Sequence, residues 1–127
     1  MDNERSAVIQ LGGESYELIL TTKATKAIAG RYGGLENLGD KLLRSENMEM
    51  ALDEIVWLVT LLANQSILIH NLREKEHPRD LLTEDVVELL TSPSDLADFK
   101  SALMEALIKG TKRNVESESD PKNGAAG

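Results

Sequence analysis

The sequence contains no cysteine, so disulfide bonds, thiol catalysis and cysteine-ligated zinc are excluded. Aromatic residues make up only 3% of the chain, which makes its single tryptophan, Trp57, informative. Long hydrophobic runs are also missing, because the longest nearly unbroken one, Ile55–Ala63, falls far short of the ~20 residues that cross a bilayer. The polar start Met1–Arg5 is not followed by the apolar core of a signal peptide. We therefore expect a cytoplasmic protein without a membrane span.

Basic residues are outnumbered, with 14 Lys and Arg against 22 Asp and Glu and a formal net charge of −8. Nucleic-acid binding depends on clustered Lys and Arg that displace counterions from phosphates, and anionic membranes attract the same clusters. The composition therefore argues against both partners. The length of 127 residues fits one domain that buries a core without a disulfide or a metal.

The N-terminal part of the chain predicts a β-hairpin followed by helices. Two apolar, β-rich runs over Ala7–Leu20 flank Gly12-Gly13, and glycine supplies the positive φ of a tight turn. A helix is predicted from about Lys23 to Tyr32, with Thr22 as its N-cap. A further helical turn is predicted between Leu35 and Leu43.

The longest predicted helix runs from about Met48 to Arg73 and is apolar on two sides. One broad face contains Leu52, Ile55, Val56, Leu58, Val59, Leu62, Ala63, Ile67 and Ile69. A second stripe, nearly opposite, contains Trp57, Leu61, Leu68 and Leu72, and only a narrow polar strip remains, with Asp53, Thr60, Asn64 and Asn71. A surface helix normally has one apolar face, so the second stripe lies either in the core or in an interface with another polypeptide. Tryptophan anchors cores and is also enriched at interface hot spots, so the residue types leave both interpretations open.

Two more helices are predicted beyond His77-Pro78. The first covers Glu84–Leu90, with Thr83 as its N-cap. The second follows a start signal made by Ser92, Pro93 and Asp95, runs to Lys109 and ends at Gly110.

The rest of the chain, from Thr111 onward, lacks apolar periodicity and is rich in Glu and Ser. It predicts a disordered tail over residues 111–127, after a single domain over residues 1–110. Together the elements predict an α+β fold that is mainly α, in which an N-terminal β-hairpin precedes a bundle of four or five helices.

No residue pattern indicates catalysis or ligand binding. His70 and His77 lie about two turns apart, without the acidic partner of a zinc-binding helix. The adjacent carboxylates Asp53-Glu54 and Glu84-Asp85 point in different directions on a helix and do not form an acid–base pair. The glycine pairs match no phosphate-binding loop, and the charge-mixed segment Arg73–Asp80 is interpreted as a solvated loop. We therefore expect no catalytic, cofactor or metal site, and a protein that is not an enzyme.

Several segments share the layout of one known family. They are the hairpin segment Ile9–Leu18, the following Thr22–Ile28, the stretch Arg31–Asp40, a long helix that contains Trp57, and two shorter helices. In these features, over about residues 6–109, the chain resembles the tail assembly chaperones of long-tailed bacteriophages and prophages. The Arg-Tyr-Gly-Gly-Leu stretch, residues 31–35, is the most distinctive part, and it has no chemical signature of its own.

The resemblance implies a function in tail assembly. Such chaperones bind the tape measure protein, keep that long chain soluble and help to recruit tail tube protein around it, and they are usually absent from the mature virion. The resemblance then implies host cytoplasm as the location and the tape measure protein as the partner. We expect a homo-oligomer of unknown order, and we select Trp57, Leu61, Leu68 and Leu72 as candidate protein-binding residues.

Two other function classes remain open. A structural head–tail connector or tail completion protein would have a similar composition but would stay in the virion. An enzyme or small-molecule module would need a pocket with convergent polar groups, and the sequence offers no such set.

Overall fold

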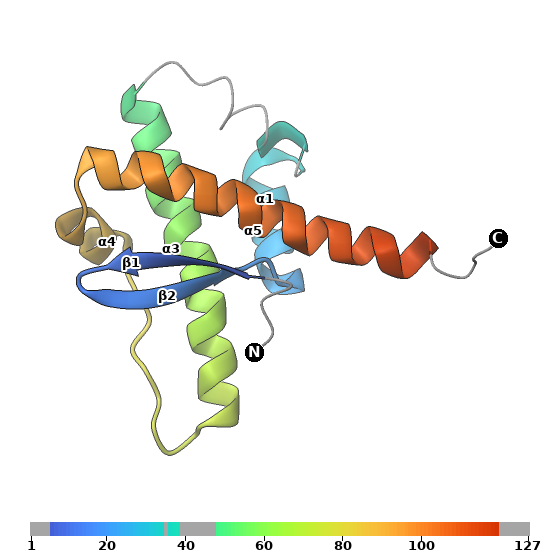
Figure 1. Cartoon of the computed structure of the whole chain (residues 1–127), viewed down its shortest axis with the longest axis horizontal. Helices are drawn as coiled ribbons and strands as arrows, with labels where there is room; N and C mark the ends of the chain where they lie inside the picture. Colours follow the sequence, from blue (N-terminus) through green and yellow to red (C-terminus); the bar gives the residue numbers. More distant parts are fainter. Residues whose placement is uncertain (1–5, 35, 39–47, 120–127) are drawn as a thin grey trace.

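The structure is a computed structural model, which describes residues 6–34, 36–38 and 48–119. An N-terminal hairpin precedes the helices, and the predicted α+β, mainly α fold is confirmed (Figure 1). A single helical turn covers residues 36–38, and the rest of the turn predicted at Leu35–Leu43 lies outside the described residues. The elements are β1 (Ser6–Leu11), β2 (Glu14–Ile19), α1 (Thr22–Tyr32), α3 (Met48–Arg73), α4 (Glu84–Leu90) and α5 (Pro93–Ser119).

The hairpin forms as the sequence predicts. Its strands are antiparallel, with Leu11 opposite Glu14, so that Gly12 and Gly13 make the two-residue turn. Both glycines have positive φ, 59° and 85°, as the turn that suits the twist of the strands requires. In the register of the strands, Ile9 lies opposite Tyr16. A lone hairpin is only marginally stable in water, and here its buried face packs onto α3 and α5.

Helix α1 begins one residue earlier than predicted, and its N-cap is Thr21 in place of Thr22. The Thr21 hydroxyl accepts a hydrogen bond from the Ala24 amide at 3.0 Å and donates one to Gln65 Oε1 of α3 at 2.5 Å. This second bond selects Thr21, because it joins the cap to a nearly buried glutamine. The helix ends at Gly33, whose φ of 86° is left-handed.

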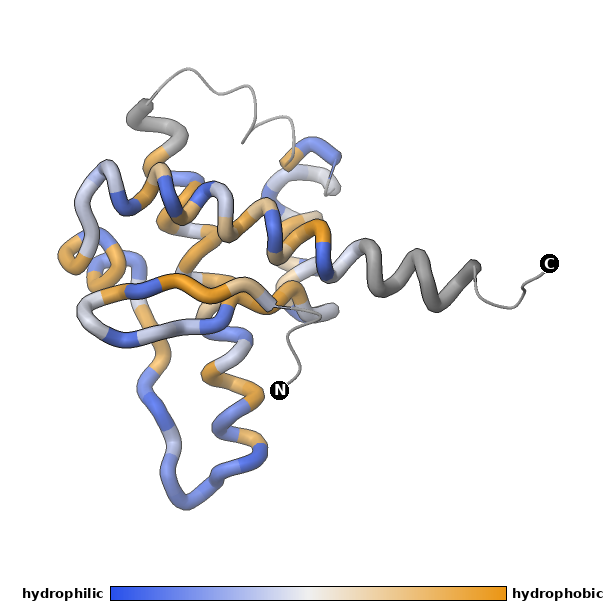
Figure 2. Tube along the Cα trace, viewed as in Figure 1, coloured by the Kyte–Doolittle hydropathy of each residue, from blue (hydrophilic) through white to orange (hydrophobic). Residues whose placement is uncertain are grey.

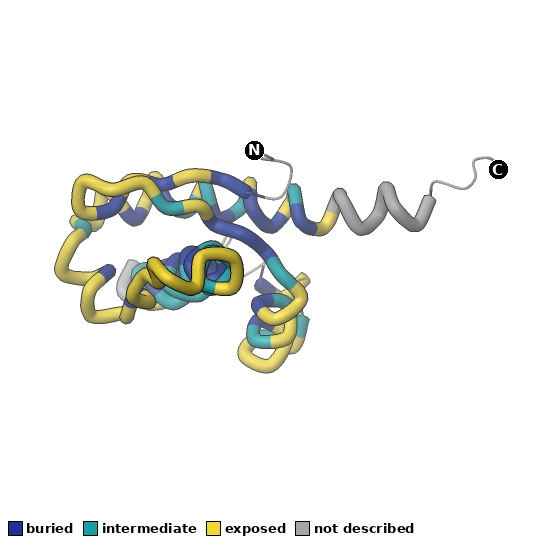
Figure 3. The backbone as a smooth tube through the Cα atoms, turned by 90° about the horizontal axis from the view of Figure 1, so that it is seen from below, coloured by how far each residue is buried: buried dark blue, intermediate teal, exposed yellow. Residues whose placement is uncertain are grey.

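Helix α3 has the bounds that the sequence predicts, Met48–Arg73, and lies at the centre of the fold. It packs against the hairpin, α5, α4 and α1, and Figure 3 shows it end-on beneath the layer formed by the hairpin and α5. Most of its predicted broad face is buried, including Leu58, Val59 and Leu62. The segment Leu52–Arg73 is long and apolar enough to cross a membrane by length and composition, but a core helix meets the same criteria.

The starts of α4 and α5 confirm their predicted signals. The Thr83 hydroxyl accepts from the Val86 amide at 3.2 Å. Ser92 and Asp95 form a reciprocal capping box, in which the Ser92 amide donates to Asp95 Oδ2 at 2.9 Å and the Asp95 amide to the Ser92 hydroxyl at 3.3 Å.

The predicted end of the last helix is wrong, because α5 continues through Gly110 to Ser119. Gly110 is buried inside the helix, where a β-carbon would come within 2.9 Å of Leu20 Cβ and Cδ2. The glycine therefore permits a close approach to Leu20 and does not stop the helix. Residues 111–119 are helical, residues 120–127 lie outside the described part, and the predicted domain limits stay a prediction.

Candidate functional site

The four candidate residues of the second stripe do not form one open surface. Trp57 and Leu61 are half-buried and pack against the core. Leu68 is half-buried as well, whereas Leu72, at the C-terminal end of α3, is 73% exposed. The stripe thus divides between core and surface along its length, and protein binding by any of the four stays a prediction.

Two residues of α1, Arg31 and Tyr32, lie against the Trp57 ring. The Arg31 guanidinium lies 4.4 Å from the centre of the Trp57 ring, and the Tyr32 ring meets it edge-on at 6.0 Å. Arg31 Nε also pairs with Glu54 Oε1 at 3.2 Å, and the Tyr32 hydroxyl donates to the same oxygen. A pocket of ≈ 510 Å³ adjoins this cluster, but its polar groups already bind one another. The cluster therefore joins α1 to α3.

The ionisation of Tyr32 reflects this environment. Burial raises the pKa of Tyr32 above its usual value of 10.0, and the hydrogen bond to Glu54 raises it further. At physiological pH the phenol is therefore neutral, and its hydroxyl donates a hydrogen bond to the Glu54 carboxylate.

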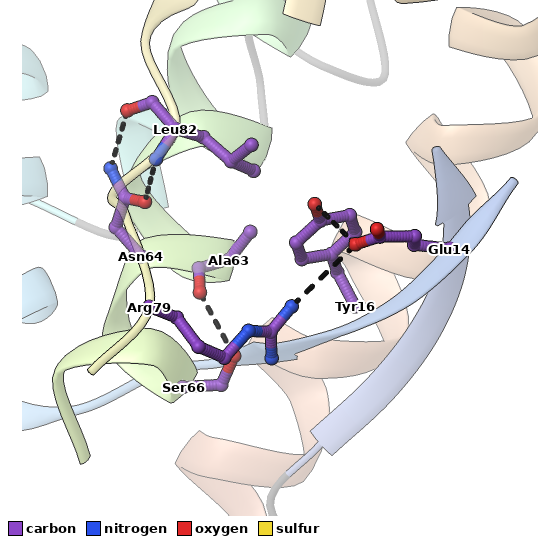
Figure 4. Close-up of polar contacts among 7 residues, drawn as sticks. All are labelled: Glu14, Tyr16, Ala63, Asn64, Ser66, Arg79 and Leu82. Carbon is purple, nitrogen blue, oxygen red and sulfur yellow. Dashed lines mark hydrogen bonds and ion pairs between the residues drawn. The ribbon is translucent and has the colours of Figure 1, made fainter. Parts of the chain in front are cut away.

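The polar strip of α3 holds the connector to α4, a role that sequence reasoning missed. Asn64 Nδ2 donates to the Leu82 carbonyl at 2.9 Å, and the Leu82 amide donates to Asn64 Oδ1 at 2.7 Å (Figure 4). Asn71 binds the backbone of Arg79 in the same two-bond manner, at 3.1 Å and 2.8 Å. The spacing of seven between two asparagines on one side of a helix was the available signal.

The connector is an exposed loop, as the sequence predicts for Arg73–Asp80, and its Arg79 side chain also contacts the hairpin. The Arg79 guanidinium lies 5.3 Å from the centre of the Tyr16 ring and 3.9 Å from Glu14 Oε1 (Figure 4). His70 Nε2 lies 2.9 Å from the His77 carbonyl, which places both histidines in the same connection. Within the described ranges, no three His, Cys, Asp or Glu side chains gather closely enough to hold a metal ion.

Among the residues whose burial is described, exposed large apolar side chains gather on and beside α4. Val86 is 38% exposed, Leu89 83% and Leu90 49%, whereas Val87 is buried. Residues three and four apart share one side of a helix, so Val86, Leu89 and Leu90 form one face. Leu81, just before the helix, is also exposed. In Figure 2, α4 has hydrophobic (orange) segments at the left edge of the view. We call Leu81, Val86, Leu89 and Leu90 the α4 patch.

A groove lies beside α4, between α3 and the junction of α4 with α5. Its volume is ≈ 250 Å³. Its lining is mostly apolar, and its charged members, Asp53 and Glu88, are both acidic. The lining residues are Leu52, Asp53, Val56, Glu88, Thr91, Ser92, Pro93 and Leu96.

The sequence did contain a signal for the α4 patch. The helix EDVVELL has Val or Leu at four of its seven positions, and so short a helix on the surface buries only one side. Apolar residues beyond those that one side can hold must face solvent or a partner. The sequence predicts the bounds of α4 correctly. The candidate protein-binding residues that it suggests, however, all lie on α3.

The chain was also compared with known proteins. No protein-family model matches it, and no match was found among the curated proteins or the solved structures. The resemblance to tail assembly chaperones therefore depends on the sequence pattern alone.

Proposed function

We propose that this chain is a tail assembly chaperone of a long-tailed phage or prophage, and that it binds the tape measure protein and does not catalyse a reaction. The observation that carries the proposal is the α4 patch, in which Val86, Leu89 and Leu90 expose one apolar face of a short helix. Contiguous apolar surface on a soluble protein marks sites of interaction with other molecules.

The energetics favour a partner over solvent at this patch. Removing apolar surface from water stabilises a complex by about 25 cal/mol per Å². Leu89 is 83% exposed, so nearly all of its side chain is available for such burial. The net charge of −8 keeps a protein with this surface in solution before it meets its client.

Co-expression with the neighbouring tape measure protein tests the proposal. We expect wild-type chain to move the client into the soluble fraction and Leu89→Ser to lose most of this effect. Ile108→Ser is the matched control, because Ile108 is 57% exposed but lies outside the α4 patch. A client that is equally insoluble with and without the chain would refute the proposal.

Purified virions separate the proposal from a structural function. A chaperone should be missing or sparse in mature particles, whereas a head–tail connector or tail completion protein should be present in fixed copy number. Quantitative mass spectrometry of purified virions distinguishes the two outcomes.

A further inference from the structure

The chain segment that contains the α4 patch has charged residues of one sign only. Residues 80–99 contain no Lys or Arg but six acidic residues, which are Asp80, Glu84, Asp85, Glu88, Asp95 and Asp98. This short segment includes α4, its flanks and the first turns of α5. The apolar face and the strongest negative charge of the chain therefore coincide.

These carboxylates are available to a partner. All six are exposed, and none forms an ion pair with a Lys or Arg of the described residues. Asp95 accepts the Ser92 amide in the capping box of α5. Glu88, on α4, and Asp53, on α3, both line the groove. A side chain that entered this groove would therefore meet two carboxylates and the apolar groups of Leu52, Val56 and Leu96.

We propose that the α4 patch and the groove beside α4 dock an amphipathic helix of the client whose apolar seam is flanked by Lys and Arg. This inference rests on the proposed chaperone function and adds the chemistry of the client segment. Helices bind apolar surfaces through anchors spaced three and four residues apart, and an acidic border selects basic flanks. The proposed contact therefore combines burial of Leu89 with pairing of client cations to Glu88 and its neighbours.

The same charges argue against two other occupants. Two copies of the chain that met patch to patch around a twofold axis would bring their acidic borders together, which repels. An anionic membrane surface would be repelled in the same way. A basic amphipathic helix would bury the apolar face and would also pair its cations with the carboxylates.

Binding of designed peptides to the full-length chain tests the inference by fluorescence anisotropy. The probe is a labelled amphipathic peptide of about 18 residues, or five helical turns, with a leucine seam flanked by lysines. One comparison peptide replaces the lysines with glutamates, and another replaces the leucines with serines. We expect the lysine peptide to bind at least about tenfold more tightly than either comparison peptide. The advantage over the glutamate peptide should shrink as salt is added.

Substitutions locate the contact. Leu89→Ser should weaken binding of the lysine peptide about tenfold, whereas the matched Ile108→Ser should leave it unchanged. Glu88→Lys should weaken the lysine peptide and strengthen the glutamate peptide, while Glu74→Lys, an exposed charge reversal in the connector, should do neither. Because Glu74, Glu88, Leu89 and Ile108 are all exposed, none of the four substitutions removes core packing.

Any of four results would overturn the inference. Equal binding of the lysine and glutamate peptides would show that the α4 patch does not prefer a helix with basic flanks. Equal effects of Leu89→Ser and Ile108→Ser would show that the peptide does not bind at the α4 patch. Dimers of the chain that Leu89→Ser dissociates in sedimentation would show that a second copy occupies the patch. If the peptides fail while the whole client is still solubilised, this inference falls and the chaperone function stands.

Discussion

Gly110 of α5 lies so close to Leu20 that a β-carbon at residue 110 would come within 2.9 Å of both Cβ and Cδ2 of the leucine. The contact joins the last helix to the residue that follows β2, from the opposite end of the described chain. One of the two opposing atoms is a β-carbon, which cannot rotate away. The absence of a side chain at Gly110 is therefore part of how α5 packs onto the hairpin.

We expect Gly110→Ala to destabilise the fold. Alanine is better than glycine in a helix interior by about 1 kcal/mol, but overpacking a tight contact costs about 1–3 kcal/mol. The balance predicts a net loss of roughly 1 kcal/mol in the free energy of unfolding, measured by urea denaturation.

Gly30→Ala is the matched control for that prediction. Gly30 lies in α1, and a β-carbon added there would meet no heavy atom within 4 Å, so only the helix preference remains. We expect this variant to be stabilised by about 0.5–1 kcal/mol. A Gly110→Ala variant that is stabilised to the same degree would show that α5 does not press on Leu20.

Asn64→Ala should release the connector from α3. The side chain makes two hydrogen bonds to the backbone of Leu82, a nearly buried residue, and each such bond contributes about 1 kcal/mol. We expect a loss of about 1–3 kcal/mol in the free energy of unfolding, together with faster hydrogen exchange at the Leu82 amide.

The equivalent change at Asn71 should matter less. Its two bonds to Arg79 are exposed to solvent, where water replaces them at little cost. Asn71→Ala should therefore lower stability by less than about 1 kcal/mol. Equal losses of unfolding free energy for the two variants would contradict the claim that the Asn64 hydrogen bonds stabilise more because Leu82 is buried.

Tyr32 should make the fold sensitive to alkaline pH. Because burial and Glu54 raise the pKa of Tyr32, the folded state keeps a proton that the unfolded state gives up above pH 10.0. The stabilisation is complete below the unfolded pKa and is lost as pH rises towards the folded pKa. The urea midpoint should therefore fall as pH rises past 10.0.

Tyr32→Phe separates this effect from other alkaline changes. The variant should be less stable at neutral pH by about 1 kcal/mol, since it lacks the hydrogen bond to Glu54, but its midpoint should fall less steeply with pH. Tyr16→Phe is the comparison variant. Burial raises the pKa of Tyr16 as well, but this tyrosine lies in the hairpin and not in α1. An unchanged slope in Tyr32→Phe would show that another group causes the alkaline loss.

Features determined by neighbouring residues were predictable from the sequence. The hairpin turn follows from Gly12-Gly13, and the start of α5 follows from Ser92 and Asp95, because each interaction closes within a few residues. The bounds of α3 follow from its long apolar pattern and the break at His77-Pro78.

Features determined by distant residues were not predictable. The N-cap of α1 is selected by Gln65, and the place of Gly110 within α5 is set by Leu20. The apolar stripe of α3 was visible, but Arg31 of α1 covers Trp57 there, which a helical wheel cannot show. Which apolar face stays open depends on what the rest of the chain covers, and here it is the face of α4.

Hydrogen exchange on the chain with and without its co-purified tape measure protein tests the central claim most directly. Amides of a short exposed helix exchange quickly in the free protein, so protection by a client is easy to detect there. We predict slower exchange over residues 81–96, which include α4 and much of the groove lining. Protection confined to the Trp57–Leu72 part of α3 or to the hairpin, with α4 unchanged, would contradict that claim.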